Sequence, residues 1–370
     1  MAIDRQRRRS LRWLAALPPL GVLPNACVRE NSDRSPRLIG CCALREGGFA
    51  AVVLDQAWRE LASIPLAARG HGIAVAPQGH LAVVLGRRPS RTATVIDLRQ
   101  LRAAHTFDTP RQRHLFGHGF FGPNGGLFYT TENDFEAPTS VLGVYDVNAG
   151  FRRLGEMITH GIGAHEAVLL GDGAAIAVAN GGIETHPDYP RRKLNLANMR
   201  PSLAYLRAAD GALLEQVQLP AKWHQVSLRH LAQASDGSVW VGGQDEGGGG
   251  GGAPLVLRHR RGDAALQVIG DSQQTSALAG YVGSVSAHSS RPIVAVTSPR
   301  GNRVNTYEAT TGRLLDATSL VDVCGVARSS DGMIVSTGEG EVRSVQAHRG
   351  ATHRTLRWDN HLSAIEVRGS

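Results

Sequence analysis

The chain of 370 residues is 42% hydrophobic and 19% charged, which is typical of a compact globule and not of a disordered or membrane-embedded chain. Its formal net charge is +8, but half of this excess comes from residues 1–27, which contain five arginines and one aspartate. The remaining excess is small and scattered, so it excludes nucleic acid as the expected partner.

The N-terminus has the pattern of an export signal. The basic stretch Arg7–Arg12 precedes the apolar run Trp13–Leu23, which is too short to span a bilayer. Paired arginines followed by Leu11 favour the twin-arginine export route of bacteria, and therefore a periplasmic protein. We interpret residues 1–27 as the signal peptide, residues 28–37 as a linker and residues 38–370 as one domain.

The four cysteines do not form a zinc-binding or redox motif. Cys27 follows the expected cleavage position, but Pro24 and Asn25 are poor lipobox residues, so we do not expect lipid anchoring. Cys41 and Cys42 are neighbours in a predicted strand and must point to opposite faces, so at most one of them can meet the remaining cysteine, at position 324. Buried free thiols are the simpler expectation.

A repeating unit runs through the chain from about residue 70. It has a polar or His-Gly start, a short apolar strand, a tight turn and a second apolar strand. Copies begin at His71, His118 and His165, with a spacing of 47 residues, and others begin at His230, Gly283 and Cys324. Turns such as those at 123–125 and 235–237 have the Asn-Gly and Asp-Gly chemistry of hairpins. Two further strands follow in each unit, which predicts the four-stranded blade of a β-propeller.

The two ends of the chain complement each other. Residues 38–44, 49–54 and 58–64 are predicted as three strands with no inner strand before them, whereas His361–Val367 has the pattern of an inner strand. Joining these segments closes the ring and leaves no open sheet edge. We therefore predict an all-β protein, a seven-bladed β-propeller whose first blade is closed by the C-terminal strand.

Five histidines begin predicted inner strands, so the fold should bring them to one mouth of the central channel. Neutral imidazole is the commonest protein ligand of transition metals, and such a ring favours iron, copper or another transition metal, including haem iron. The alternative is that these histidines are structural and join one blade to the next. A shift of one residue in register would also point each imidazole into the interior of its blade and away from the channel. The candidate metal ligands are His71, His118, His165, His230 and His361.

Polar residues at the ends of second strands share this predicted face. The insertion Ile183–Pro201 is predicted to form a lid, and the run Gly247–Gly252 a flexible loop. No hydrolase, kinase or dehydrogenase motif is present in the sequence. The candidate lid and anion contacts are Glu132, Asn133, Asn180, Glu184, His186 and Arg300.

Several longer strings resemble a bacterial protein family of unknown function. They include Thr131–Glu136, Ala179–Pro187 and Ser227–His230, and the resemblance extends over residues 38–345. Members of this family resemble exported propellers of the WD-repeat or quinoprotein amine dehydrogenase type, and are often encoded beside imelysin-like periplasmic proteins associated with iron uptake. The resemblance implies a metal-related role and provides no catalytic residues.

Two functional hypotheses follow. The first is a monomeric, non-enzymatic periplasmic propeller that binds a metal or a protein partner of an iron-uptake system through the histidines. The second is a propeller enzyme of the lactonase or lyase type that acts on a small anion. Its acid/base and binding residues are then His165, Glu166, His230 and Arg229, with Arg300 as a further anion contact.

Overall fold

The computed structural model describes residues 35–189, 192–248, 252–330, 332–347 and 349–366. The chain divides into two units, Met1–Ser32 and Asp33–Ser370, and only the second contains described residues. The expected signal peptide and Cys27 therefore lie outside the described residues, as do residues 249–251 of the glycine run.

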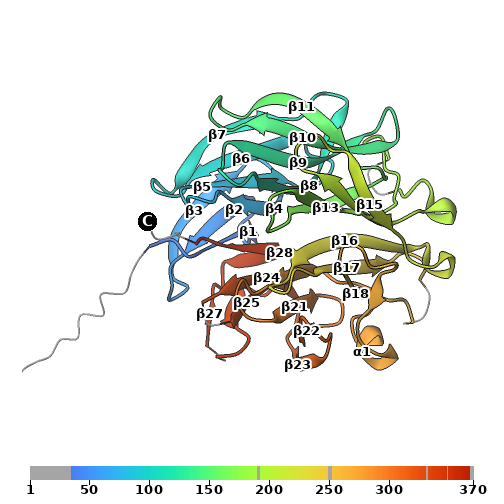
Figure 1. Cartoon of the computed structure of the whole chain (residues 1–370). Helices are drawn as coiled ribbons and strands as arrows, with labels where there is room; N and C mark the ends of the chain where they lie inside the picture. The colour runs from blue at the N-terminus through green and yellow to red at the C-terminus, as the bar shows by residue number, and fades with distance from the viewer. Residues whose placement is uncertain (1–34, 190–191, 249–251, 331, 348, 367–370) are drawn as a thin grey trace, which may run out of the picture. The chain divides into compact units, whose positions relative to one another are not determined.

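Seven four-stranded antiparallel sheets make up the second unit, and six of them are built from four consecutive strands (Figure 1). The inner strands of neighbouring sheets contact each other in a closed ring, so the predicted seven-bladed propeller is confirmed.

Six blades follow one another along the chain. The second and third blades are β4 (Gly70–Val75), β5 (Leu81–Gly86), β6 (Thr92–Asp97), β7 (Arg102–Asp108), then β8 (Arg113–Phe121), β9 (Leu127–Asp134), β10 (Thr139–Asp146) and β11 (Arg152–Ile158). The fourth and fifth are β12 (Ala164–Leu169), β13 (Ala175–Asn180), β14 (Ser202–Arg207), β15 (Leu213–Val217), then β16 (Val226–Gln233), β17 (Val239–Asp245), β18 (Val256–His259) and β19 (Gln267–Val268). The sixth and seventh are β20 (Ser284–Ala287), β21 (Ile293–Ser298), β22 (Arg303–Glu308), β23 (Leu314–Ser319), then β24 (Val323–Ser329), β25 (Gly332–Thr337), β26 (Glu341–Ser344) and β27 (Gly350–Thr352).

The first blade joins the two ends of the chain, as predicted. It consists of β1 (Leu38–Leu44), β2 (Phe49–Leu54) and β3 (Glu60–Leu66), with the C-terminal strand β28 (Leu356–Ala364) as its inner strand. β28 pairs antiparallel with β1, and Figure 1 shows the two strands side by side. This pairing gives the first blade its fourth strand and closes the ring of seven blades.

The hydrophobic core lies between the blades. Seven buried clusters correspond to the seven interfaces between neighbouring sheets, and each draws apolar side chains from two adjacent blades. Trp240 and Tyr307, for example, are fully buried and pack together across the interface between the fifth and sixth blades. Burying a side chain of this size stabilises the fold by about 1.5–3 kcal/mol.

The turns between strands form by the chemistry that the sequence predicts. The Asp97 side chain accepts hydrogen bonds from the backbone N–H groups of Arg99 and Gln100, at 2.8 and 3.0 Å. Gly125, in the turn between β8 and β9, adopts a φ of 71°, which a side chain disfavours. These turns reverse the chain every few residues and so produce the short strands of each blade.

Helical structure is sparse. The described residues include the 3-10 helices Leu196–Asn198 and Ala221–Trp223 and one α-helix, α1 (Ser272–Ser276), whose first turn is capped by the Asp271 side chain. None of the helices in the described part of the chain is long and apolar enough to cross a membrane.

The described cysteines are buried free thiols. Cys41 packs in the interface with the second blade, whereas Cys42 packs with Cys324 in the interface with the seventh. The predicted opposite orientation of Cys41 and Cys42 is therefore confirmed. Burial raises the pKa of Cys42 and Cys324 to about 12, so these thiols stay protonated at neutral pH.

Candidate functional site

The inner strands that carry a channel histidine all lose their register with the second strand at or next to that histidine. In β12, for instance, His165 is the extra residue between Ala164 and Glu166, and in β8 the shift between Leu115 and Gly119 contains His118. The other three shifts lie in β4, β16 and β28. β20 contains no histidine and pairs without a shift, whereas β24 is shifted without one. A bulge redirects a side chain out of the normal alternation of a strand, and here it accompanies each imidazole in the channel.

The five imidazoles form one layer across the channel, which we call the histidine layer: His71, His118, His165, His230 and His361. Their rings pack edge to face or tilted against one another. The ring centroids of His118 and His361 lie 4.6 Å apart, and those of His165 and His230 lie 4.8 Å apart. His71 contacts the rings of His118 and His361 at 4.9 and 4.7 Å. Four of the five are buried and His165 is half-buried.

Two glycines allow the strands to approach closely enough for this layer. A Cβ atom on Gly72 would lie 2.4 Å from the backbone oxygen of Gly117, which is less than any real contact of this kind. Gly117 itself has a φ of 103°, and a Cβ atom there would lie 2.5 Å from Cδ2 of His71. Neither position has room for a side chain.

We expect the substitution Gly117→Ala to lower the free energy of unfolding by about 1–3 kcal/mol, because it adds backbone strain and a clash with His71. Denaturant unfolding measures this change. Gly155→Ala is the matched control, since no atom lies within 4 Å of a Cβ atom at that position. Equal effects of the two substitutions would show that the close approach at Gly117 does not constrain the layer.

Glu166 orients two of the histidines. Its carboxylate lies 3.5 Å from Nδ1 of His118 and 3.3 Å from Nδ1 of His230, and it accepts a hydrogen bond from the backbone N–H of Leu231 at 3.1 Å. Burial alone would raise the pKa of Glu166, but its interactions with His118 and His230 outweigh burial and hold the pKa well below its usual range. An ionised Glu166 favours the tautomer in which each Nδ1 carries the proton and each Nε2 has a free lone pair.

Five other ring nitrogens of the layer have no hydrogen-bond partner. They are buried, and a buried polar atom without a partner is costly unless a ligand satisfies it. In His361, Nδ1 lies 3.4 Å from Oγ of Ser284, which again leaves Nε2 free. The buried ring nitrogens without a partner are Nε2 of His118, His230 and His361, and Nδ1 of His71 and His165.

The geometry allows three of these histidines to hold one metal ion. Two groups of three have ligand atoms that all lie within 4.8 Å of one another. In a tetrahedral site with Zn–N bonds of about 2.0–2.1 Å, ligand atoms are about 3.4 Å apart, so small ring rotations are needed to close the site. The two groups share His118, and they are His71, His118 and His361, and His118, His165 and His230.

Burial keeps three imidazoles of the layer neutral. It lowers the pKa of His71, His165 and His361 well below the ordinary value of 6.5, and repulsion between neighbouring imidazolium charges lowers the pKa further. Neutral imidazole is the form that binds a metal ion.

This neutrality predicts that the metal-free protein loses stability in mild acid. Below pH 6.5 the histidines of the unfolded chain become protonated, whereas the same buried imidazoles in the folded protein stay neutral. The free energy of unfolding therefore falls as the pH falls. Each imidazole that stays neutral contributes a slope of about 1.4 kcal/mol per pH unit in this window. Glu166, whose pKa is lowered, adds a loss only below about its ordinary value of 4.5.

Urea unfolding at several pH values between about 7.5 and 5 measures this slope. His71→Gln removes one of the groups that protonate only on unfolding, so it is expected to lower the slope by about 1.4 kcal/mol per pH unit. The exposed His105 on β7 provides the control substitution His105→Gln. A slope that His71→Gln leaves unchanged would contradict the assignment of a neutral His71.

The histidine layer separates two cavities. The larger, of about 490 Å³, has His71 and His165 in its wall, together with Arg69, Arg87, Arg88 and Arg229. We call it the arginine cavity. The smaller, of about 260 Å³, is lined by His118, Glu166 and His361, with Ser284 and Ser286 beside them. The layer is therefore accessible from two sides of different charge.

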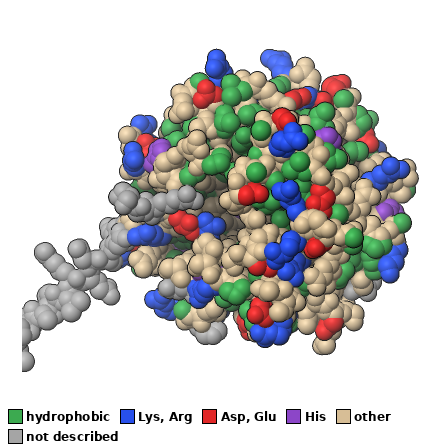
Figure 2. Space-filling model, in the orientation of Figure 1, with side chains coloured by type: hydrophobic (Ala, Val, Ile, Leu, Met, Phe, Trp, Pro, Cys, Tyr) green, Lys and Arg blue, Asp and Glu red, His purple; other side chains and the backbone are tan. Residues whose placement is uncertain are grey.

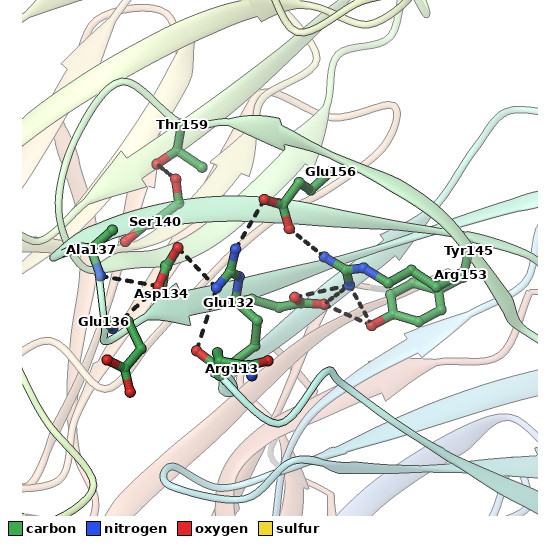
Figure 3. Close-up of polar contacts among 11 residues, drawn as sticks. Arg113, Glu132, Asp134, Glu136, Ala137, Ser140, Tyr145, Arg153, Glu156 and Thr159 are labelled. Carbon is green, nitrogen blue, oxygen red and sulfur yellow. Dashed lines mark hydrogen bonds and ion pairs between the residues drawn. The ribbon is translucent and has the colours of Figure 1, made fainter.

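Glu132 does not reach the channel, which corrects the expectation that it faces the mouth. Its fully buried carboxylate points to the outer strands of the third blade, where it accepts hydrogen bonds from Arg153 at 2.9 and 3.0 Å and from Tyr145 at 2.8 Å (Figure 3). Thr130 donates to it at 2.6 Å. Arg153 and Arg113 continue this network to Glu156 and Asp134 (Figure 3). We call these residues the β9 network, and its place in the blade makes it structural.

The other predicted lid and anion residues have mixed positions. The insertion contains only the 3-10 helix Leu196–Asn198 among its described residues, and its Ile183 lines the arginine cavity. The Asn133 side chain donates to the backbone oxygen of Thr185, which ties the insertion to the third blade. Lys193 of the insertion pairs with Glu246 of the fifth. These two contacts fix the insertion next to the cavity.

The remaining candidates do not line the cavity. Asn180 is fully buried and donates to the backbone oxygen of Thr159, and Glu184 contacts Asn195 only through its backbone. His186 packs edge to face against Phe135, at 5.3 Å between ring centroids. The Arg300 guanidinium lies over the ring of Tyr281, at 5.0 Å.

Sequence reasoning missed several residues of this region. Arg69, Tyr281 and Asn360 line the arginine cavity, and Asp359 pairs with Arg69 at 2.5 Å and with Arg87 at 3.7 Å. Asp359 and Asn360 lie within the register shift of β28 that also contains His361. Their position directly before His361 in the sequence is the signal by which they could have been predicted.

These features define the class: a seven-bladed β-propeller whose channel is crossed by five imidazoles with unsatisfied nitrogens. The chain belongs to the DUF1513 family, described as a protein of unknown function, whose family model matches residues 64–365. The comparison with curated proteins found no match.

Solved structures show the same fold at low sequence identity. A hydrazine synthase structure from Kuenenia stuttgartiensis is 13% identical, with a TM-score of 0.59, and the match covers 83% of this chain and 89% of that chain. A functionally unknown protein from Desulfotomaculum acetoxidans is 10% identical, with a TM-score of 0.60 and coverage of 88% and 98%. Identities this low show the propeller fold alone.

Proposed function

We propose that this protein binds a transition metal ion in the histidine layer, with His118 as the central ligand. The observation that carries the proposal is the position of Glu166 between Nδ1 of His118 and Nδ1 of His230, which leaves both Nε2 atoms free and without a partner. A carboxylate that holds a metal-binding imidazole in this way is a common feature of metal sites. A ligand set of imidazoles suits zinc, copper, iron and nickel.

The proposal extends to a non-enzymatic component of periplasmic iron uptake. Export is supported by the basic and apolar pattern of residues 7–23, and the link to iron by the family resemblance in the sequence. The mixed surface supports neither a nucleic-acid nor a strongly charged partner, because acidic and basic side chains are interspersed over the face shown in Figure 2. A periplasmic iron-uptake protein is the partner that we propose.

The alternative is an enzyme that acts on a small anion. It is favoured by one observation, that the arginine cavity places Arg229 beside His165, a neutral imidazole able to act as a general base. Glu166 is less suited to acid/base catalysis near neutral pH, because its lowered pKa keeps it ionised.

Elemental mass spectrometry of the protein purified from the native periplasm tests the proposed function. We expect about one equivalent of iron, copper or zinc in the wild type, and none in the variant with His118, His165 and His230 changed to alanine. His105→Ala, on the exposed strand β7, is the control and should retain the metal. Absence of metal from a folded wild-type protein would contradict the proposal and favour the enzyme. Growth of the triple variant under iron limitation, compared with that of the control, tests the link to iron uptake.

A further inference from the structure

The arginine cavity collects positive charge with little compensation. Among its described lining residues there are four arginines and no aspartate or glutamate. Arg69 and Arg87 share the single carboxylate of Asp359. Arg229 shares Glu246 with Lys193, and its Nη2 donates to Glu246 at 2.8 Å. Each of these two carboxylates therefore pairs with two cations.

Arg88 makes no ion pair with any described residue. Among the described residues, no carboxylate lies within ion-pair distance of its guanidinium, and that side chain is exposed to the cavity. The surrounding walls desolvate Arg88, and repulsion from Arg229 and Arg87 adds to this, so its pKa falls to about 10. An anion in the cavity would relieve this repulsion, because an arginine fork binds a carboxylate through two parallel hydrogen bonds.

The volume and position of the cavity specify the ligand further. A volume of about 490 Å³ lies in the usual range for small-molecule sites and is larger than a single inorganic ion needs. His71 and His165 belong to the same wall, and each has an Nδ1 atom without a partner. A ligand held by the arginines therefore lies directly against the histidine layer.

We propose that the arginine cavity binds a small polycarboxylate, which donates one carboxylate oxygen to the metal ion in the histidine layer and pairs its other carboxylates with Arg88 and its neighbours. The coordination step rests on the proposed function, whereas the anion site rests on the arginines alone. The arginines repel a free cation from this side, so the polycarboxylate also provides a route by which metal reaches the layer as an anionic complex.

Isothermal titration calorimetry on metal-free protein tests the anion site. The probe is tricarballylate, a tricarboxylate without the chelating hydroxyl of citrate, at low ionic strength, with acetate and inorganic phosphate for comparison. We expect tricarballylate to bind more tightly than either. Arg88→Gln should weaken its binding by about 10- to 100-fold, with partial recovery in Arg88→Lys, which keeps the charge but loses the fork. Arg99→Gln removes the same charge from the turn between β6 and β7, away from both cavities, and should leave the affinity for tricarballylate unchanged.

Three results would overturn the inference: no tricarballylate binding, tighter binding of phosphate, or binding that Arg88→Gln leaves unchanged. Repeating the titration on zinc-loaded protein separates the two proposals. Coordination predicts tighter tricarballylate binding with zinc, and equally tighter zinc binding with tricarballylate, since coupling is reciprocal. Equal affinities would overturn the coordination step. Zinc binding without anion binding overturns this inference alone. Anion binding without any metal binding overturns the proposed function and, with it, the coordination step, but leaves the anion site.

Discussion

The substitution His118→Ala is expected to weaken transition-metal binding by about 100-fold or more, because both possible groups of three ligands include His118. His361→Ala removes a ligand from only one group, so the group of His118, His165 and His230 survives, and a smaller loss is expected. Competition against a chromogenic chelator measures the affinity of each variant for zinc. The difference between these two variants distinguishes a site centred on His118 from a diffuse attraction of the whole layer.

Glu166→Gln provides a second test of the same site. Glutamine cannot accept both Nδ1–H groups as an ionised carboxylate does, so we expect zinc affinity to fall by about 10- to 100-fold while all five imidazoles remain. His105→Ala is again the control. Wild-type zinc affinity in a folded His118→Ala protein would contradict the assignment, and circular dichroism establishes whether the variant is folded.

The second large effect is expected in the β9 network. Arg153→Met leaves the fully buried carboxylate of Glu132 without its cation and should lower the free energy of unfolding by about 3–5 kcal/mol. Tyr145 and Thr130 still donate to Glu132, but a neutral donor does not replace the lost charge. Guanidinium chloride unfolding measures the change through its midpoint and slope.

Two matched variants sharpen this prediction. Arg207→Met breaks the ion pair between Arg207 and Asp210, whose side chains are 53% and 52% exposed, and should cost about 0–1 kcal/mol. The double substitution Glu132→Leu and Arg153→Met removes both charges and should recover most of the stability. If Arg153→Met cost no more than Arg207→Met, the β9 network would not be the buried ion pair that we describe.

The fold was predictable because each blade repeats the same local sequence pattern. Hairpin turns recur between short apolar strands, and the observed β1 and β2 coincide with the predicted strands at 38–44 and 49–54. The third strand, predicted at 58–64, begins instead at Glu60, because Trp58 adopts a left-handed φ of 58° in the turn and the register shifts between Val53 and Leu54. Boundaries of this kind depend on backbone geometry that composition does not encode.

The site was predictable only in part. Histidines at equivalent positions of five blades must come close together, and they do so in the channel. The β-bulges that turn them inward are irregularities of pairing, and strand alternation by itself does not predict them. Glu132 faces the outer strands of its blade, where it pairs with Arg153. These two residues are 21 positions apart in the sequence, so the pairing is not visible as a local motif. Asp359 and Arg69 are 290 residues apart, and only ring closure brings them together.

Anomalous diffraction from crystals of the zinc-loaded protein is the decisive test of the proposed metal site. Data collected above and below the zinc absorption edge locate the ion without assumptions about its ligands. We predict one strong peak in the channel, about 2.0–2.1 Å from Nε2 of His118 and from two further imidazole nitrogens of the layer. A peak only at surface histidines, or none in crystals of protein that contains one equivalent of zinc, would contradict it.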